Sequence, residues 1–261
     1  TTPEGFKFVY NKWSKNRAPG YEMIQAATMS NPFLPTDYVQ ALRDSYPPQL
    51  IEAYLNGEFV NLTSGAVYTC YDRKLNGTTR GIKDTDHLHI GMDFNVGKMS
   101  AIVHVEDNRD GTKITSAVDE FMGLLDTPAM IKAIENKYPE HRITIYPDAS
   151  GQNRKSSNAS ETDISQLKKA FKVNARTKNP FVKDRVASVQ GMLCNANEER
   201  RYFINEVLCP ETAESLEQQI YNKQGEPDKS HDNDHPNDAL GYYINNQFPI
   251  RAKGGRLNID G

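Results

Sequence analysis

The chain has 261 residues, 37% of them hydrophobic, and a formal net charge of −3. This length suits one large domain or one domain with a substantial appendage. The net charge excludes a globally basic protein, and no apolar run reaches the roughly 18 residues that a membrane span needs. The three cysteines, Cys70, Cys194 and Cys209, form no C-x-x-C pair, which predicts a reducing compartment without disulfides.

The first 85 residues differ from the rest because they mix short extended pieces with two predicted helices. One helix is expected at residues 37–46, after the N-cap residue Thr36. The second is expected at residues 48–56, before Gly57. The remaining pieces are predicted as short strands at 7–10 and 21–28, an extended stretch at 58–71 and a polar, turn-rich linker at 72–86.

From residue 87 onward the apolar pattern becomes regular and predicts a sheet with helices. A hairpin opens this part, and a helix that begins at Thr127-Pro128 precedes the fourth strand. The strands are expected at residues 87–95, 99–106, 113–121, 142–146 and 201–205, and the helices at 127–138, 163–171, 182–195, 211–221 and from Pro236 onward. This order predicts an α/β fold in which helices flank a mixed sheet.

Acidic residues stand at the boundaries of three predicted elements. Asp93 lies inside the first strand and Asp148 directly follows the fourth. Asp234 should lie just outside the last helix and Asp238 one turn inside it. If the first and fourth strands are neighbours, these carboxylates converge. Hard oxygen ligands without cysteine suit Mg²⁺ or Mn²⁺, and two such ions roughly 3.5–4 Å apart can hydrolyse a phosphodiester.

Each acidic position also has an ordinary structural interpretation. Asp148 can begin a turn with Ala149-Ser150-Gly151. Carboxylates near a helix N-terminus are favoured by the helix dipole, which applies to the acidic start of the last helix. His231 and His235 have the i, i+4 spacing of a zinc pair, but Pro236 places the predicted helix start between them.

Basic residues are concentrated between Gln152 and Arg185, where nine basic and three acidic residues give 9 − 3 = +6. A basic face on a mildly acidic protein is compatible with a polyanionic partner, although a solvated helix face has the same composition. The candidates for phosphate contacts are Lys98, Arg154, Lys155, Lys183 and Arg185. Such contacts would position a duplex without reading its sequence.

Four motifs in the same order resemble the large terminase subunit of tailed bacteriophages. They are Ile-Gly-Met-Asp-Phe-Asn from residue 90, Tyr-Pro-Asp-Ala-Ser-Gly from 146, Asn-Pro-Phe-Val-Lys-Asp-Arg-Val from 179 and Asp-His-Pro-Asn-Asp-Ala-Leu-Gly-Tyr from 234. The resemblance implies a ribonuclease H-like nuclease domain at residues 86–250. It also implies that residues 1–85 are the end of the ATPase domain with its linker, and that 251–261 form a flexible tail.

The resemblance also implies an activity and a set of site residues. The activity is metal-dependent cutting of concatemeric double-stranded viral DNA, with Mg²⁺ or Mn²⁺ in a two-metal site. The family's catalytic carboxylates fall on Asp93, Asp148 and the acidic start of the last helix, where Asp234 is the choice and Asp238 the alternative. Ribonuclease H-like enzymes often carry a Glu near the end of a middle strand, and Glu120 is available there.

Partners and location follow from the same resemblance. They are double-stranded DNA, the small terminase subunit and the portal protein, in the cytoplasm of the infected bacterial host and outside the mature virion. No Gly-x-x-x-x-Gly-Lys-Ser/Thr phosphate loop is present in these 261 residues, so no ATPase site is expected in this fragment.

Two other functions remain compatible with the sequence. A non-catalytic DNA-binding or portal-docking module would keep the basic face without assembling the carboxylates. A ribonuclease H-like resolvase or recombinase would use the same carboxylates, but it would leave residues 1–85 without an explanation.

Overall fold

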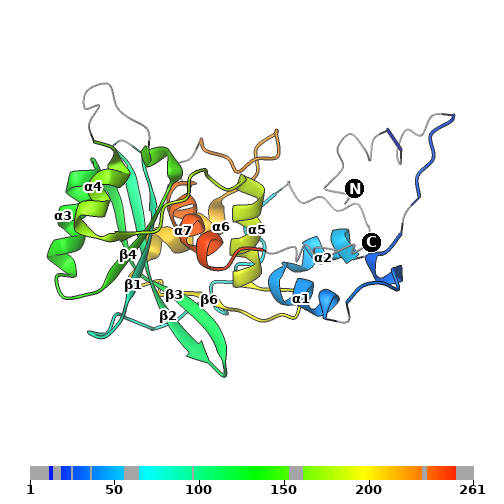
Figure 1. The fold of residues 1–261 in the computed structure, drawn as a ribbon, viewed down its shortest axis with the longest axis horizontal. Coiled ribbons are helices and arrows are strands. Elements are labelled where there is room, and N and C mark those ends of the chain that lie inside the picture. The colour runs from blue at the N-terminus through cyan, green and yellow to red at the C-terminus, as the bar shows by residue number, and fades with distance from the viewer. Residues whose placement is uncertain are drawn as a thin grey trace, which may run out of the picture.

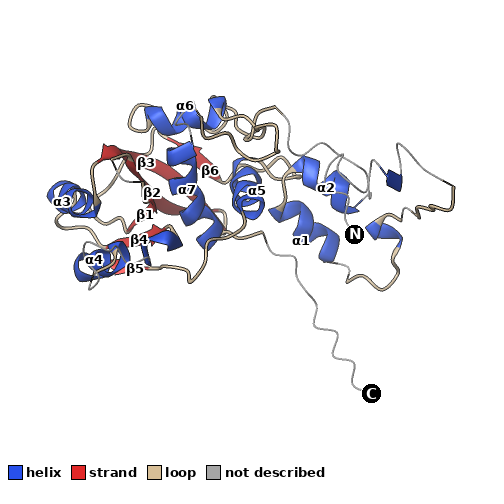
Figure 2. Ribbon diagram, turned by 90° about the horizontal axis from the view of Figure 1, so that it is seen from above, coloured by secondary structure: helices blue, strands red, loops and turns tan. Residues whose placement is uncertain are grey.

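The computed structural model describes residues 12–13, 19–24, 26–35, 37–55, 65–95, 97–152, 161–230 and 234–250. These residues contain a six-stranded mixed sheet with helices on both faces (Figures 1 and 2). The strands are β1 Leu88–Asp93, β2 Met99–Arg109, β3 Thr112–Leu124, β4 Ile143–Pro147, β5 Lys172–Val173 and β6 Tyr202–Ile204. They lie in the order β5-β4-β1-β2-β3-β6. The predicted α/β fold, a mixed sheet flanked by helices, is confirmed.

The first three strands form an antiparallel meander. β2 and β3 meet at Asp110 and Gly111, whose φ values of 52° and 81° suit the two-residue hairpin turn that an Asp-Gly pair favours. Both strands extend closer to the turn than predicted, because the turn needs only these two residues. On its other side β1 pairs in parallel with β4, so the C-terminal ends of β1 and β4 lie at the same edge of the sheet.

Helices bury the two faces of the sheet separately. On one face, Ile90, Met92 and their neighbours pack against α3 and α4. On the opposite face, α5, α6 and α7 form the larger core cluster. The bounds are α3 Thr127–Lys137, α4 Asp163–Ala170, α5 Val182–Leu193, α6 Pro210–Gln218 and α7 Asp234–Gln247. None of the helices in the described residues is both long and apolar enough to cross a bilayer.

A glycine sets the distance between α7 and the centre of the sheet. A Cβ atom added to Gly91 in β1 would lie 2.1 Å from the backbone oxygen of Ala239 and 3.1 Å from Cβ of Tyr243. The backbone of α7 therefore touches β1 directly, which only a residue without a side chain permits. This contact holds the first turns of α7 beside the end of β1, where Asp93 lies.

The segment before β1 packs against the sheet domain. Asn76 is fully buried, and its side-chain amide donates to the backbone oxygens of Leu193 and Tyr202 at 2.9 and 2.8 Å. Arg80 pairs with Asp86 at 2.9 Å and with Asp107 at 3.0 Å. These contacts attach part of the predicted linker at 72–86 to α5, β2 and β6.

The predicted helices near the N-terminus are present as α1 Tyr38–Ser45 and α2 Pro48–Leu55. Their apolar residues form a small separate cluster that includes Leu42, Tyr46 and Ile51. Asp44 in α1 accepts hydrogen bonds through its backbone oxygen from Asn195 and Arg201. The helix pair is thereby joined to the region just beyond α5.

Several predicted boundaries are wrong. Residues 21–28 form no strand where they are described, and a 3-10 helix, η2, occupies Thr28–Ser30. The short strand β5 was not predicted, because two residues carry no readable periodicity. α7 begins at Asp234, two residues before the predicted start at Pro236. Residues 7–10, 58–64 and 251–261 lie outside the described part of the chain.

The contact at Gly91 predicts a loss of stability on substitution. Gly91→Ala should lower the free energy of unfolding by about 1–3 kcal/mol, the usual cost of overpacking a core, because α7 must move away from β1. Urea unfolding of the variant measures this. The control is Gly81→Ala, since an added Cβ at Gly81 meets no atom within 4 Å. Equal stability of the two variants would contradict the proposed close contact.

Candidate active site

Adjacent strand ends bring Asp93 and Asp148 to one edge of the sheet. Met92 and Pro147 are register partners in the parallel pair of β1 and β4. The backbone N–H of Asp148 also donates to the oxygen of Met92 at 2.9 Å. Both aspartates are 7% exposed. The condition under which the sequence predicted convergence, that the first and fourth strands are neighbours, is therefore met.

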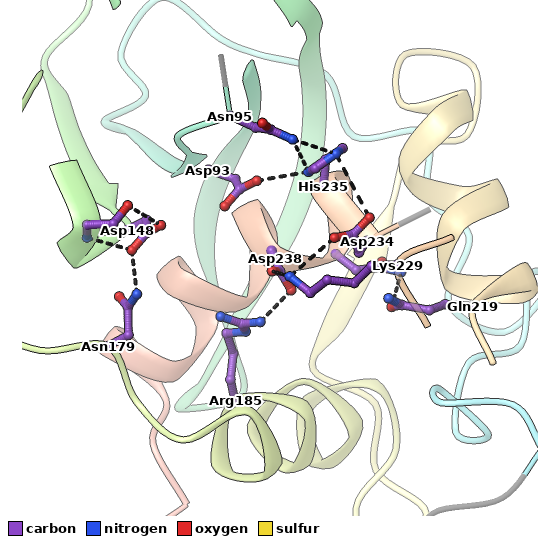
Figure 3. Close-up of polar contacts among 12 residues, drawn as sticks. Asp93, Asn95, Asp148, Asn179, Arg185, Gln219, Lys229, Asp234, His235 and Asp238 are labelled. Atoms are coloured by element: carbon purple, nitrogen blue, oxygen red, sulfur yellow. Dashed lines mark hydrogen bonds and ion pairs between the residues drawn. The ribbon is translucent and has the colours of Figure 1, made fainter. Parts of the chain in front are cut away.

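The side chain of Asp148 is held by donors from the short 3-10 helix η3, Ala149–Gln152, and from the loop before α5 (Figure 3). Ser150 donates to it twice, from its backbone N–H at 2.8 Å and from its hydroxyl at 2.7 Å. The side-chain amide of Asn179 donates to Asp148 Oδ1, while Asn179 Oδ1 accepts from the backbone N–H of Ala149 at 2.8 Å. Both carboxylate oxygens thus have partners, and Asn179 ties the end of β4 to the loop before α5.

The first turns of α7 supply two further carboxylates. Asp234 and Asp238 lie one helical turn apart, so they share a face of the helix. They are 3% and 8% exposed. Burial raises the pKa of Asp238, Arg185 counteracts that rise, and the nearby negative charge of Asp93 adds to it. The charge of Asp93 therefore reaches the same face of α7.

Arg185 is the buried partner of Asp238. Its guanidinium pairs with Asp238 Oδ1 and lies over the ring of Tyr242, 4.6 Å from the ring centre. A Cβ added to Gly241 would come within 2.7 Å of Arg185 Cγ, so the side chain fits closely against α7. Arg185 is 4% exposed. It was predicted to contact phosphate, but the structure places it inside the protein as a counter-charge.

His235 links β1 to α7. Its Nδ1 lies 3.1 Å from Asp93 Oδ2, and its Nε2 lies 2.9 Å from the side-chain amide of Asn95. The prediction considered His235 only as half of a zinc pair with His231, which lies outside the described residues. Its position next to Asp234 at a helix start was the available signal for a site residue.

Lys229 faces the two carboxylates of α7 from the loop before the helix. Its ammonium lies 3.3 Å from Asp234 Oδ2 and 3.5 Å from Asp238 Oδ2. The other oxygen of Asp234, Oδ1, is buried without a hydrogen-bond partner. Nothing in the sequence pattern marked Lys229, because the contact joins a polar loop to a helix face.

The remaining predicted site residues lie in different places. Glu120 is two strands away from β1 and accepts hydrogen bonds from the backbone N–H groups of Glu211 and Thr212, at 3.0 and 2.9 Å. It caps α6 and does not face Asp93. Lys98, in the turn after β1, and Lys183, in the first turn of α5, are exposed. Arg154 and Lys155 lie outside the described residues.

The donor set has the chemistry of a site for hard cations, but its arrangement is not that of a closed metal cage. Carboxylate oxygens are the ligands that Mg²⁺ and Mn²⁺ prefer. One such donor is Asp234 Oδ1, which accepts no hydrogen bond and lies 3.9 Å from His235 Nε2. Among the described residues, no three His, Cys, Asp or Glu side chains are grouped so that they could hold a metal ion.

Comparison with known proteins defines the class. Residues 90–247 match the family described as Terminase RNaseH-like domain, which makes the sheet domain RNaseH-like. Residues 1–74 match the family described as Terminase large subunit, T4likevirus-type, N-terminal. The chain belongs to the family of phage terminase large subunits. A comparison with curated proteins found no match.

Solved structures agree on the fold. The large terminase of a thermophilic bacteriophage gives a TM-score of 0.67 at 15% identity, over 94% of this chain and 61% of that one. The P22 large terminase nuclease domain gives a TM-score of 0.54 at 14% identity, over 72% of this chain and 96% of that one. At these identities the likeness shows the fold alone. The chain spans about three fifths of the length of the thermophilic phage's terminase.

The buried pair of Arg185 and Asp238 predicts a strong effect on stability. Arg185→Met should lower the free energy of unfolding by about 3–5 kcal/mol, because it leaves the carboxylate of Asp238 without its buried counter-charge. The double variant with Asp238→Asn should recover part of this loss. Urea unfolding of both single variants and the double variant measures the coupling. Lys183→Met, on the exposed side of α5, serves as control, and additive losses would contradict the pairing.

Proposed function

We propose that this chain is a metal-dependent endonuclease that hydrolyses phosphodiester bonds of concatemeric double-stranded viral DNA during packaging. The observation that carries the proposal is the placement of Asp93 and Asp148 at adjacent ends of β1 and β4, beside the acidic first turns of α7. Membership of the terminase large-subunit family supports the same activity.

The cation would be held by Asp93, Asp148 and a carboxylate of α7. We choose Asp238 as the third ligand, because burial and then the nearby negative charge of Asp93 raise its pKa. Asp93 and Asp148 also both contribute to the raised pKa of Tyr242, one turn further along α7, so their charges act on this part of the helix. The sequence favoured Asp234 because that residue was expected to precede the helix, but the helix already includes it.

The protein's own groups would orient this site. Arg185 fixes the direction of Asp238 from α5, and Asn179 fixes the end of β4 beside Asp148. Divalent cations held by these carboxylates would supply activation of a water and stabilisation of the leaving oxygen. Lys98 and Lys183, both exposed, are candidates to contact phosphates of the duplex. We assign the same role to Arg154 and Lys155 from their charge alone.

The wider setting is proposed from the family. The large-subunit family implies DNA and the packaging machinery as partners, and we propose the small terminase subunit and the portal protein among them. The site of action would be the cytoplasm of the infected bacterial host. The division into residues 1–85 and a nuclease domain at 86–250 is part of the same proposal.

A non-catalytic DNA-binding or portal-docking module is the second candidate. It is favoured by one observation, that no three potential ligands in the described residues are grouped around a common cation position. A resolvase or recombinase has less support, because residues 1–74 match the N-terminal family of terminase large subunits.

Removal of one carboxylate tests the endonuclease directly. The protein should nick plasmid DNA with Mn²⁺ or Mg²⁺ and lose this activity in EDTA. Asp93→Asn should lower the rate by more than the roughly 10–100-fold that loss of a supporting residue costs at a metal site. Gel analysis of plasmid nicking measures it, with Asp84→Asn, an exposed position before β1, as the control. Full cleavage by Asp93→Asn would exclude the mechanism and favour the docking module.

The choice between Asp234 and Asp238 has its own test. Asp238→Asn should abolish nicking and also lower the melting temperature, since Arg185 loses its partner. Asp234→Asn should reduce nicking less, because in this proposal Asp234 is not a cation ligand and only pairs with Lys229 at 3.3 Å and His235 at 3.9 Å. Nicking is compared below the melting temperature of both variants. If Asp234→Asn is inactive and Asp238→Asn still cuts, then Asp234 is the third ligand, as the sequence predicted.

A further inference from the structure

The loop before α7 carries a lysine at a defined position. Tyr221 and Pro227 form an antiparallel bridge, and Asn222 accepts the backbone N–H of Gly225 at 2.9 Å through its own oxygen. Asp228 donates its backbone N–H to the oxygen of Ile220 at 2.8 Å. The loop is thus closed on itself directly before Lys229. Lys229 leaves this turn and reaches towards the carboxylates of α7 (Figure 3).

The ammonium of Lys229 lies where negative charges converge. It contacts one oxygen each of Asp234 and Asp238, at 3.3 and 3.5 Å. Although partial burial opposes its charge, Asp238, Asp234 and Asp93 together raise the pKa of Lys229. A third carboxylate, from β1, therefore adds to the attraction. The ammonium contacts the same kind of donor atoms that a divalent cation would use.

Two features show that this contact is exchangeable. The side chain of Lys229 is 67% exposed, while those of Asp234 and Asp238 are 4% and 11% exposed. An exposed ion pair contributes little to stability, so the lysine can swing into solvent without emptying packed space. Its location also opposes a purely stabilising role, because a positive charge at a helix N-terminus is unfavourable with respect to the helix dipole.

We propose that Lys229 is a built-in counter-cation that competes with divalent cations for Asp234 and Asp238 and leaves the site when such a cation binds. This inference rests on the proposed metal site. In the absence of metal, Lys229 reduces repulsion among the carboxylates. When a divalent cation is present, Lys229 raises the cation concentration that is needed to occupy the carboxylate site. The conformation of the loop at residues 221–230 would then depend on whether a divalent cation is bound.

Cation binding without DNA tests the competition. Mn²⁺ is titrated into the full 261-residue protein, and free Mn²⁺ is followed by electron paramagnetic resonance. Lys229→Ala and Lys229→Gln should lower the Kd for Mn²⁺ by about three- to tenfold, since the competing pairs are exposed and individually weak. Lys223→Ala, an exposed lysine of the same loop, should leave the Kd unchanged.

A second measurement separates competition from general damage. In EDTA, Lys229→Ala should melt at a lower temperature than the wild type, because repulsion at α7 is no longer reduced. Saturating Mn²⁺ should remove that difference. An unchanged or higher Kd for Mn²⁺ in Lys229→Ala would overturn the inference while leaving the metal site in place. A third outcome is that Lys229→Ala binds Mn²⁺ more tightly while Asp93→Asn still cuts DNA. This outcome would uphold the inference about Lys229 and contradict the proposed function.

Discussion

Burial of negative charge at one end of the sheet is the constraint on which the rest of the site depends. Four aspartates lie there, each less than one tenth exposed, and buried carboxylates are costly unless they are paired or hydrogen-bonded. The structure solves this locally, with hydrogen-bond or ion-pair partners at every one of the four carboxylates. The partners are His235 for Asp93, Ser150 and Asn179 for Asp148, and Arg185 with Lys229 for Asp234 and Asp238.

The fold creates this concentration of charge through two backbone contacts. The parallel pairing of β1 and β4 places two strand ends side by side. The direct contact of α7 with Gly91 then brings a helix start to the same edge, where partial positive charge from the helix dipole favours carboxylates. Neither contact involves a charged side chain. The backbone and the apolar core therefore position the carboxylates, and separate side chains compensate their negative charge.

The sequence predicted the fold and the strand-end aspartates because these depend on local patterns. Asp93 and Asp148 follow apolar runs with readable periodicity, and the order of strands and helices defines a mixed sheet. The helix start was placed at Pro236 because proline favours the first turn, but Asp234 already joins the helix. Arg185 was proposed as a phosphate contact because it lies in a basic stretch. Its partner is 53 positions away, and composition cannot reveal such a pairing.

The two positively charged side chains beside α7, Arg185 and Lys229, have different roles. One contributes to the stability of the fold, and the other affects the charge at the carboxylate site. Arg185 lies within α5, stacked on Tyr242 and packed against Gly241. Its removal would leave Asp238 without its buried counter-charge. Lys229 comes from a loop, and its side chain is mostly exposed. One counter-charge is therefore fixed by packing, while the other can exchange with solvent. This division keeps α7 in place on β1 while the positive charge over Asp234 and Asp238 changes.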